Sequence, residues 1–98
     1  MATRRRRIRV KYLKKLKLGK KNVWGLADES KLLIELDEKL KGKKHLEILT
    51  HEVLHLLLPD ASEQEVERMS IDLINVLWRE GYRRVDDQES DPLQDGYM

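Results

Sequence analysis

The chain has 98 residues, a formal net charge of +2 and no cysteine. Its length fits one domain with a modest core, and the lack of cysteine excludes disulfides and thiolate metal sites. No apolar run approaches the ~20 residues that span a membrane and no signal peptide is evident, so we expect a cytoplasmic protein without membrane contacts.

The charges are divided unevenly along the chain. Residues 1–22 contain eleven Lys or Arg and no acidic residue, whereas residues 86–98 contain five acidic residues and no basic one. Most of the patterned hydrophobic residues lie between these two ends. We therefore expect a basic N-terminal segment with a first strand at 1–22, the functional domain at 23–85, and an acidic flexible tail at 86–98.

The N-terminal segment begins with four consecutive arginines and continues as an alternating pattern. Ile8, Val10 and Tyr12 alternate with basic residues, which is typical of a strand with one buried face. Basic residues on the outer face protect a sheet edge from pairing with other chains. That role does not require four arginines in a row, so this block is a candidate contact to nucleic acid or to an acidic partner. The candidate contacts are Arg4, Arg5, Arg6 and Arg7.

Two further short strands are predicted before the first helix. One covers residues 23–26, after a turn at 19–22, and the other covers residues 31–37, after a turn at 28–30. Three strands joined by tight turns predict a small antiparallel sheet. In the last strand the hydrophobic residues that share one face are Leu32, Ile34 and Leu36.

The next segment carries the pattern H-E-x-x-H at residues 51–55, inside a helical run from about residue 43 to 58. Residues four apart in a helix lie one above the other, so His51 and His55 point at one spot. Two imidazoles at this spacing can supply two of the three protein ligands of a catalytic zinc ion. Glu52, beside that face, is placed to act as a general base.

The other residues of this helix predict which face is buried and where the helix ends. Its core face is expected to consist of Leu46, Leu49, Val53, Leu56 and Leu57. His45 lies away from the histidine pair on the helix, and we expect it to be solvated. Pro59 ends the helix, because a proline disfavours helical geometry at the residue before it.

A second helix is predicted from Ser62 to about Glu80. Ser62 and Glu65 form a capping box at its start, and Gly81 is a suitable C-terminal cap. The expected core face consists of Val66, Met69, Leu73, Val76 and Leu77.

A catalytic zinc site requires a third protein ligand, and the chain offers no further histidine after the motif. Glu63 lies in the first turn of the second helix, on its core-facing stripe, where a carboxylate is out of place unless a positive group receives it. The helix dipole alone also favours an acidic residue there, so both explanations stay open. Glu67, one turn later, is expected to orient an imidazole N–H.

This succession of elements resembles the gluzincin branch of the zincin metallopeptidases. The residues that carry the resemblance are a strand ending at Asp37, His51-Glu52-x-x-His55 in a helix, and Glu63-x-x-x-Glu67 at the start of the next. The chain is most similar to minimal members of the SprT-like or ImmA/IrrE-like kind, found in bacteria and phages. The resemblance covers about residues 23–85.

The resemblance implies both a fold and an activity. The fold is α+β, with a small antiparallel three-stranded sheet packed on the active-site helix and a second C-terminal helix. His51, His55 and Glu63 would hold one Zn²⁺, and Glu52 would be the general base for hydrolysis of peptide bonds. In so small a domain the activity could be latent or dependent on a partner. The protein would be located in the cytoplasm or, if a phage encodes it, in the host cytoplasm or the virion.

The resemblance also implies how a peptide or protein substrate is held. The strand with Leu32, Ile34 and Leu36 would pair with an extended peptide. Tyr82 is the side chain whose chemistry best suits stabilisation of the oxyanion.

Two alternatives belong to other functional classes. A non-catalytic structural protein, such as a virion component, would use zinc to join its two helices and would need a fourth protein ligand. A nucleic-acid-associated module would use the arginines at 4–7, and its affinity for DNA would fall with rising salt. The sequence does not assign the substrate or the oligomeric state.

Overall fold

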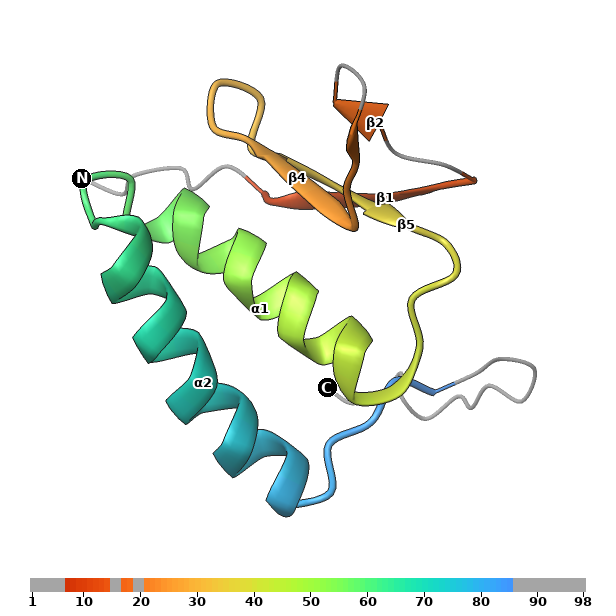
Figure 1. Cartoon of the computed structure of the whole chain (residues 1–98), viewed down its shortest axis with the longest axis vertical. Helices are drawn as coiled ribbons and strands as arrows, with labels where there is room; N and C mark the ends of the chain where they lie inside the picture. The colour runs from red at the N-terminus through yellow and green to blue at the C-terminus, as the bar shows by residue number, and fades with distance from the viewer. Residues whose placement is uncertain (1–6, 15–16, 19–20, 86–98) are drawn as a thin grey trace.

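The computed structural model describes residues 7–14, 17–18 and 21–85. In chain order, their elements are β1 (Arg9–Leu13), β2 (Lys17–Leu18), β3 (Lys21–Asn22), β4 (Gly25–Asp28), β5 (Leu33–Asp37), α1 (Gly42–Leu57) and α2 (Glu63–Arg79). The fold is α+β, as predicted, and α1 contacts both the sheet and α2 (Figure 1). Neither of these helices combines the length and apolar character needed to cross a membrane.

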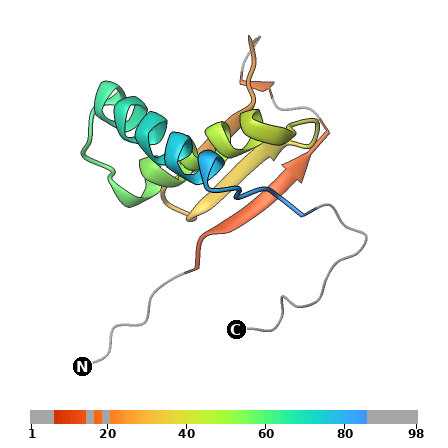
Figure 2. The same ribbon diagram turned by 90° about the horizontal axis from the view of Figure 1, so that it is seen from below.

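The main sheet has three strands in the order β1-β5-β4, while β2 and β3 form a separate small hairpin. β4 pairs with β5 in antiparallel fashion, but β1 runs beside β5 in the same direction (Figure 2). The prediction of an entirely antiparallel sheet is therefore wrong for β1. The nineteen residues between β1 and β5 allow the chain to return to its starting end, as parallel pairing requires.

β1 belongs to the same sheet as the strands of the predicted functional domain, since it pairs with β5 along its whole length. The folded unit thus begins before residue 23. Of the four N-terminal arginines, Arg7 is exposed. Residues 4–6 and the predicted acidic tail at 86–98 lie outside the described residues.

The core lies between the sheet and α1. Ile34 and Leu36 of β5 have no exposed surface, and they cluster with Leu40 and Leu56. Ile48, Leu49 and Val53 of α1 pack against this cluster. Leu57, which was predicted to join it, is 54% exposed.

α2 packs on α1 through a face that overlaps the predicted one only in part. Its buried residues are Val66, Ser70 and Ile74, spaced four apart, whereas Leu73 and Val76 are 43% and 46% exposed. Val66 was predicted to lie on the core face, and Ile74, at 4% exposed, is buried in place of Leu73 and Val76.

Both ends of α2 are fixed by the residues that the sequence indicated. The Ser62 hydroxyl accepts a hydrogen bond from the Glu65 N–H at 3.1 Å, and the Ser62 N–H donates to the Glu65 carboxylate at 2.9 Å. At the other end Gly81 has a φ of +91°, and the Gly81 and Tyr82 N–H groups donate to carbonyls of the last turn, which is the Schellman arrangement. The capping box fixes where Glu63, the first helical residue, lies.

His45 is buried, contrary to the prediction of a solvated side chain. It is 6% exposed, and the Tyr12 hydroxyl lies 2.8 Å from its Nε2 atom. Burial, together with the nearby Arg84 guanidinium, lowers the pKa of His45 below its ordinary value. Tyr12 and His45 therefore join β1 to the first turn of α1 through a neutral imidazole.

This burial predicts an acid-sensitive fold. Because the pKa of His45 is lower in the folded state, stability is complete above the unfolded pKa of about 6.5. It falls as the pH drops from there through the folded pKa, since the unfolded chain takes up the proton first. Urea denaturation between pH 5 and 8 measures the loss. The His45→Leu variant keeps the other two histidines, so a slope equal to that of the wild type would contradict the prediction.

Candidate metal centre

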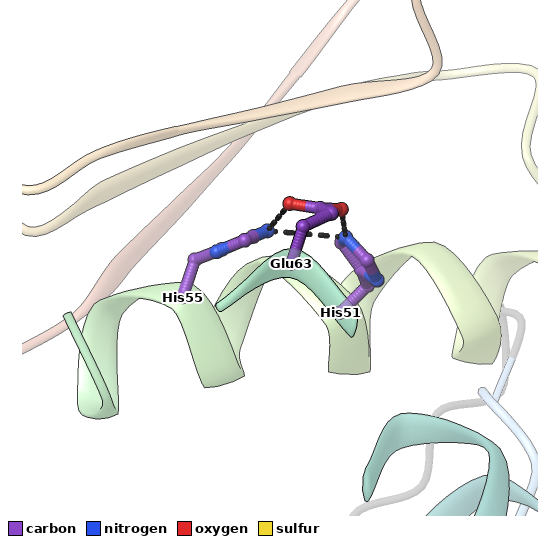
Figure 3. A group of neighbouring side chains, drawn as sticks. All are labelled: His51, His55 and Glu63. Atoms are coloured by element: carbon purple, nitrogen blue, oxygen red, sulfur yellow. Dashed lines mark hydrogen bonds and ion pairs between the residues drawn. The ribbon is translucent and has the colours of Figure 1, made fainter. Parts of the chain in front are cut away.

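The backbone of α1 brings the two motif histidines together. His51 and His55 lie one turn apart, and their Nε2 atoms are 3.1 Å from each other. The rings meet edge to face, with centroids 4.7 Å apart. Two nitrogen atoms of this pair thus face one point above the helix (Figure 3).

Glu63 reaches the same point from the first turn of α2. Its Oε2 atom is 2.9 Å from His51 Nε2, and its Oε1 atom is 3.2 Å from His55 Nε2. The reversal of the chain after α1, at Pro59, and the capping box at Ser62 set the position of this carboxylate. The structure therefore brings together the three residues that were predicted as ligands (Figure 3).

The three donors suit a metal ion in both spacing and chemistry. Their ligand atoms all lie within 4.8 Å of one another. A tetrahedral ion with metal–nitrogen bonds of about 2.0–2.1 Å holds its ligands about 3.3–3.4 Å apart, close to the 2.9–3.2 Å separations of this cluster. Two imidazoles and a carboxylate can therefore hold a metal ion here.

The cluster has three protein donors in the described part of the chain, and no fourth His, Asp or Glu joins it there. Structural zinc sites use four protein ligands, whereas catalytic sites leave a position for water or substrate. The peptidase hypothesis requires three protein ligands, whereas the structural alternative requires a fourth.

Glu52 lies beside the cluster without being one of its three donors. Glu52 lines both cavities that flank the site, one together with His51 and the other together with His55. Burial raises the pKa of Glu52 above its ordinary value, and the Glu63 carboxylate adds to this, while the two histidines oppose it. The side chain is thus a half-buried carboxylate of raised basicity beside a possible metal site.

Gly25 allows β4 to lie directly against α1 at the level of Glu52. A Cβ atom at this position would be 2.8 Å from Ile48 Cγ2, 2.9 Å from Leu36 Cδ2 and 3.3 Å from Glu52 Cγ. These contacts are too short for an ordinary side chain. Because Gly25 has no side chain, β4 can pack against α1 beside Glu52.

Replacing Gly25 by alanine should destabilise the fold by about 1–3 kcal/mol, the usual cost of overpacking a core. Urea denaturation of Gly25→Ala against wild type measures the effect. In an Ile48→Ala background the added methyl loses its closest contact, so the same substitution should cost less there. An equal cost in both backgrounds would contradict this account of the close approach.

The predicted substrate strand is not available for pairing. β5 is the central strand, with β1 on one side and β4 on the other, and Ile34 and Leu36 are fully buried. Leu32 precedes the strand in a turn, with a φ of +48°. Among the described residues the edge strand nearest α1 is β4. Sequence reasoning missed this because edge position depends on the long-range pairing of β1.

Two further predicted residues do not reach the metal ligands as expected. Tyr82 follows the end of α2, whereas Glu63 begins it, and a helix of this length spans roughly 25 Å. Tyr82 is 63% exposed and lines a separate cavity with Tyr12 and His45, so its predicted oxyanion role is wrong. Glu67 lines the cavity beside His51, but in the described part of the chain it forms no hydrogen bond to an imidazole.

Comparison of the chain with protein-family models, curated proteins and solved structures gave no significant match.

Proposed function

We propose that the protein is a zinc-dependent metallopeptidase, with Zn²⁺ held by His51, His55 and Glu63 and with Glu52 as the general base. One observation carries the proposal. The carboxylate of Glu63 meets both motif imidazoles at 2.9 and 3.2 Å, and two histidines with one glutamate form a ligand set used by zinc peptidases. The sequence resemblance to minimal gluzincins agrees with it.

The mechanism assigns a separate task to each residue. Zinc held at this site would polarise the substrate carbonyl and lower the pKa of a water molecule to about 7. Glu52 accepts the proton of the attacking water at its carboxylate and later gives it to the leaving amine. The raised pKa of Glu52 suits both transfers, because it brings the basicity of the carboxylate closer to neutral pH.

A peptide is the substrate class that best fits the surroundings of Glu52. β4 forms an edge of the described sheet beside α1, and an edge strand offers N–H and C=O groups with which an extended peptide can pair. Gly25, at the start of β4, lies close enough to Glu52 that a Cβ atom on it would be 3.3 Å from Glu52 Cγ. A peptide paired along β4 would pass beside the general base, so β4 takes the role that was first assigned to β5.

Metal content is the first test of this function. Protein purified without chelators or a histidine tag should contain one zinc per chain by mass spectrometry, and His55→Ala should contain none. Zinc-loaded wild type should cleave unstructured peptides, with activity lost on chelation and restored by zinc. Wild-type protein that takes up no zinc after reconstitution would overturn the proposal.

A further inference from the structure

We propose that the groove on the His51 side of the metal centre binds a large apolar side chain of the substrate peptide, next to the scissile bond. Trp24 and Ile71 are the residues that select it. The inference rests on the proposed peptidase function and names the substrate class of the same site.

The groove is continuous with the site. It is a cavity of about 600 Å³ bounded by the start of β4, by α1 and by α2, and it includes both His51 and Glu52. Along α1 it extends from His51 back to Lys44, a distance of roughly 10 Å at 1.5 Å per residue. An extended chain rises about 3.3 Å per residue, so about three substrate residues fit beside the scissile bond.

Large apolar side chains line part of the groove, beside several polar and charged ones. Trp24 and Ile71 come from different elements, and each leaves about half of its surface exposed, 50% and 52%. Ile48 and the buried Ile74 line the same cavity. Large apolar side chains left exposed around a concavity mark binding sites, and a tryptophan supplies a large rigid contact area.

The charged residues of the groove discriminate against acidic side chains. Glu47 and Glu67 both line it, and Glu52 lies at the end nearest the metal ligands. Apart from His51, the basic side chain in this lining is Lys44, which lies 4.0 Å from Glu47. A substrate carboxylate would lose its hydration against Ile48 and Ile74 without gaining a free cation, which is unfavourable.

The cavity on the other side of the site differs. It measures about 360 Å³, against about 600 Å³ for the groove, and Leu26, Ala27, Leu56 and Pro59 line it where the groove has Trp24 and three isoleucines. The selection of a large side chain is therefore assigned to the His51 side.

The first experiment maps cleavage of a randomised octapeptide library by zinc-loaded full-length protein, with products identified by mass spectrometry. Wild type should favour Leu, Met or Phe over Ala and Asp at one position flanking the cut, on the order of tenfold or more. Trp24→Ala should weaken this preference, and Ile71→Asp should shift it toward Lys and Arg. Leu73→Asp is the matched control, because Leu73 lies on the same helix, is 43% exposed and does not line the groove.

A second readout does not depend on turnover. In the Glu52→Gln protein, the indole N–H resonance of Trp24 is followed by NMR during titration with blocked pentapeptides that carry Leu or Asp at the centre. The Leu peptide should move this resonance and bind on the order of tenfold more tightly. Equal affinities, or an unmoved indole resonance, would overturn the inference.

The outcomes separate this inference from the peptidase function. Cleavage without preference, or a preference that Trp24→Ala and Ile71→Asp leave intact, overturns the inference and leaves the peptidase standing. Selective binding of the Leu peptide without any zinc-dependent cleavage overturns the peptidase and supports the groove as an apolar peptide site.

Discussion

Replacing Glu52 by glutamine should lower kcat for peptide hydrolysis by about 10²- to 10⁴-fold, the usual contribution of a general base. Zinc binding should persist, because Glu52 is not one of the three converging donors. Glutamine has the shape of glutamate but cannot take up the proton of the attacking water. The substitution therefore removes one chemical step from an otherwise intact site.

Steady-state kinetics of the zinc-loaded variant, with metal content measured on the same sample, test this expectation. Asp72→Asn is the matched control, since it also removes one negative charge, from an exposed position on α2 outside the groove. Its kcat should equal that of the wild type. A Glu52→Gln variant that cleaves at the wild-type rate would assign the general base to another group.

The three candidate metal ligands could be predicted to lie together because local geometry determines their positions. His51 and His55 are one helical turn apart, and helical periodicity alone places their rings together. Glu63 could be added because Pro59 and the capping box at Ser62 fix the end of one helix and the start of the next. Each of these signals depends on residues that are near one another in the chain.

The features that the sequence did not predict depend on contacts between distant segments. β5 became the central strand because β1, twenty residues earlier, pairs with it in parallel. This pairing moves the available sheet edge to β4. Similarly, Ile74 and Leu73 are both hydrophobic neighbours on α2, yet the packing of α2 buries Ile74 and leaves Leu73 43% exposed. Substrate-binding elements are harder to predict than ligands for this reason.

Replacing Glu63 by alanine should lower zinc affinity by more than about a hundredfold, since loss of even an outer-shell partner costs 10- to 100-fold. The stability of the protein in zinc should fall with it. At a zinc concentration 100 times the Kd, binding stabilises the folded state by about 2.7 kcal/mol. For a domain of this size that corresponds to roughly 10–20 °C in Tm. Thermal denaturation with and without zinc measures both effects.

Thermal denaturation in zinc and in chelator also distinguishes the two explanations for Glu63, which are metal binding and interaction with the helix dipole. If Glu63 only complements the dipole of α2, its removal costs about 0.3–1 kcal/mol, equally in zinc and in chelator. If it binds the metal, wild type and variant should melt within a few degrees of each other in chelator and diverge in zinc. Gln64→Ala, at the next position of the same turn, is the control and should retain the full zinc-dependent rise in Tm. A Glu63→Ala variant that shows the same zinc-dependent rise in Tm would contradict the assignment of Glu63 as the third zinc ligand. The proposed catalytic zinc site would then have only His51 and His55 as protein ligands.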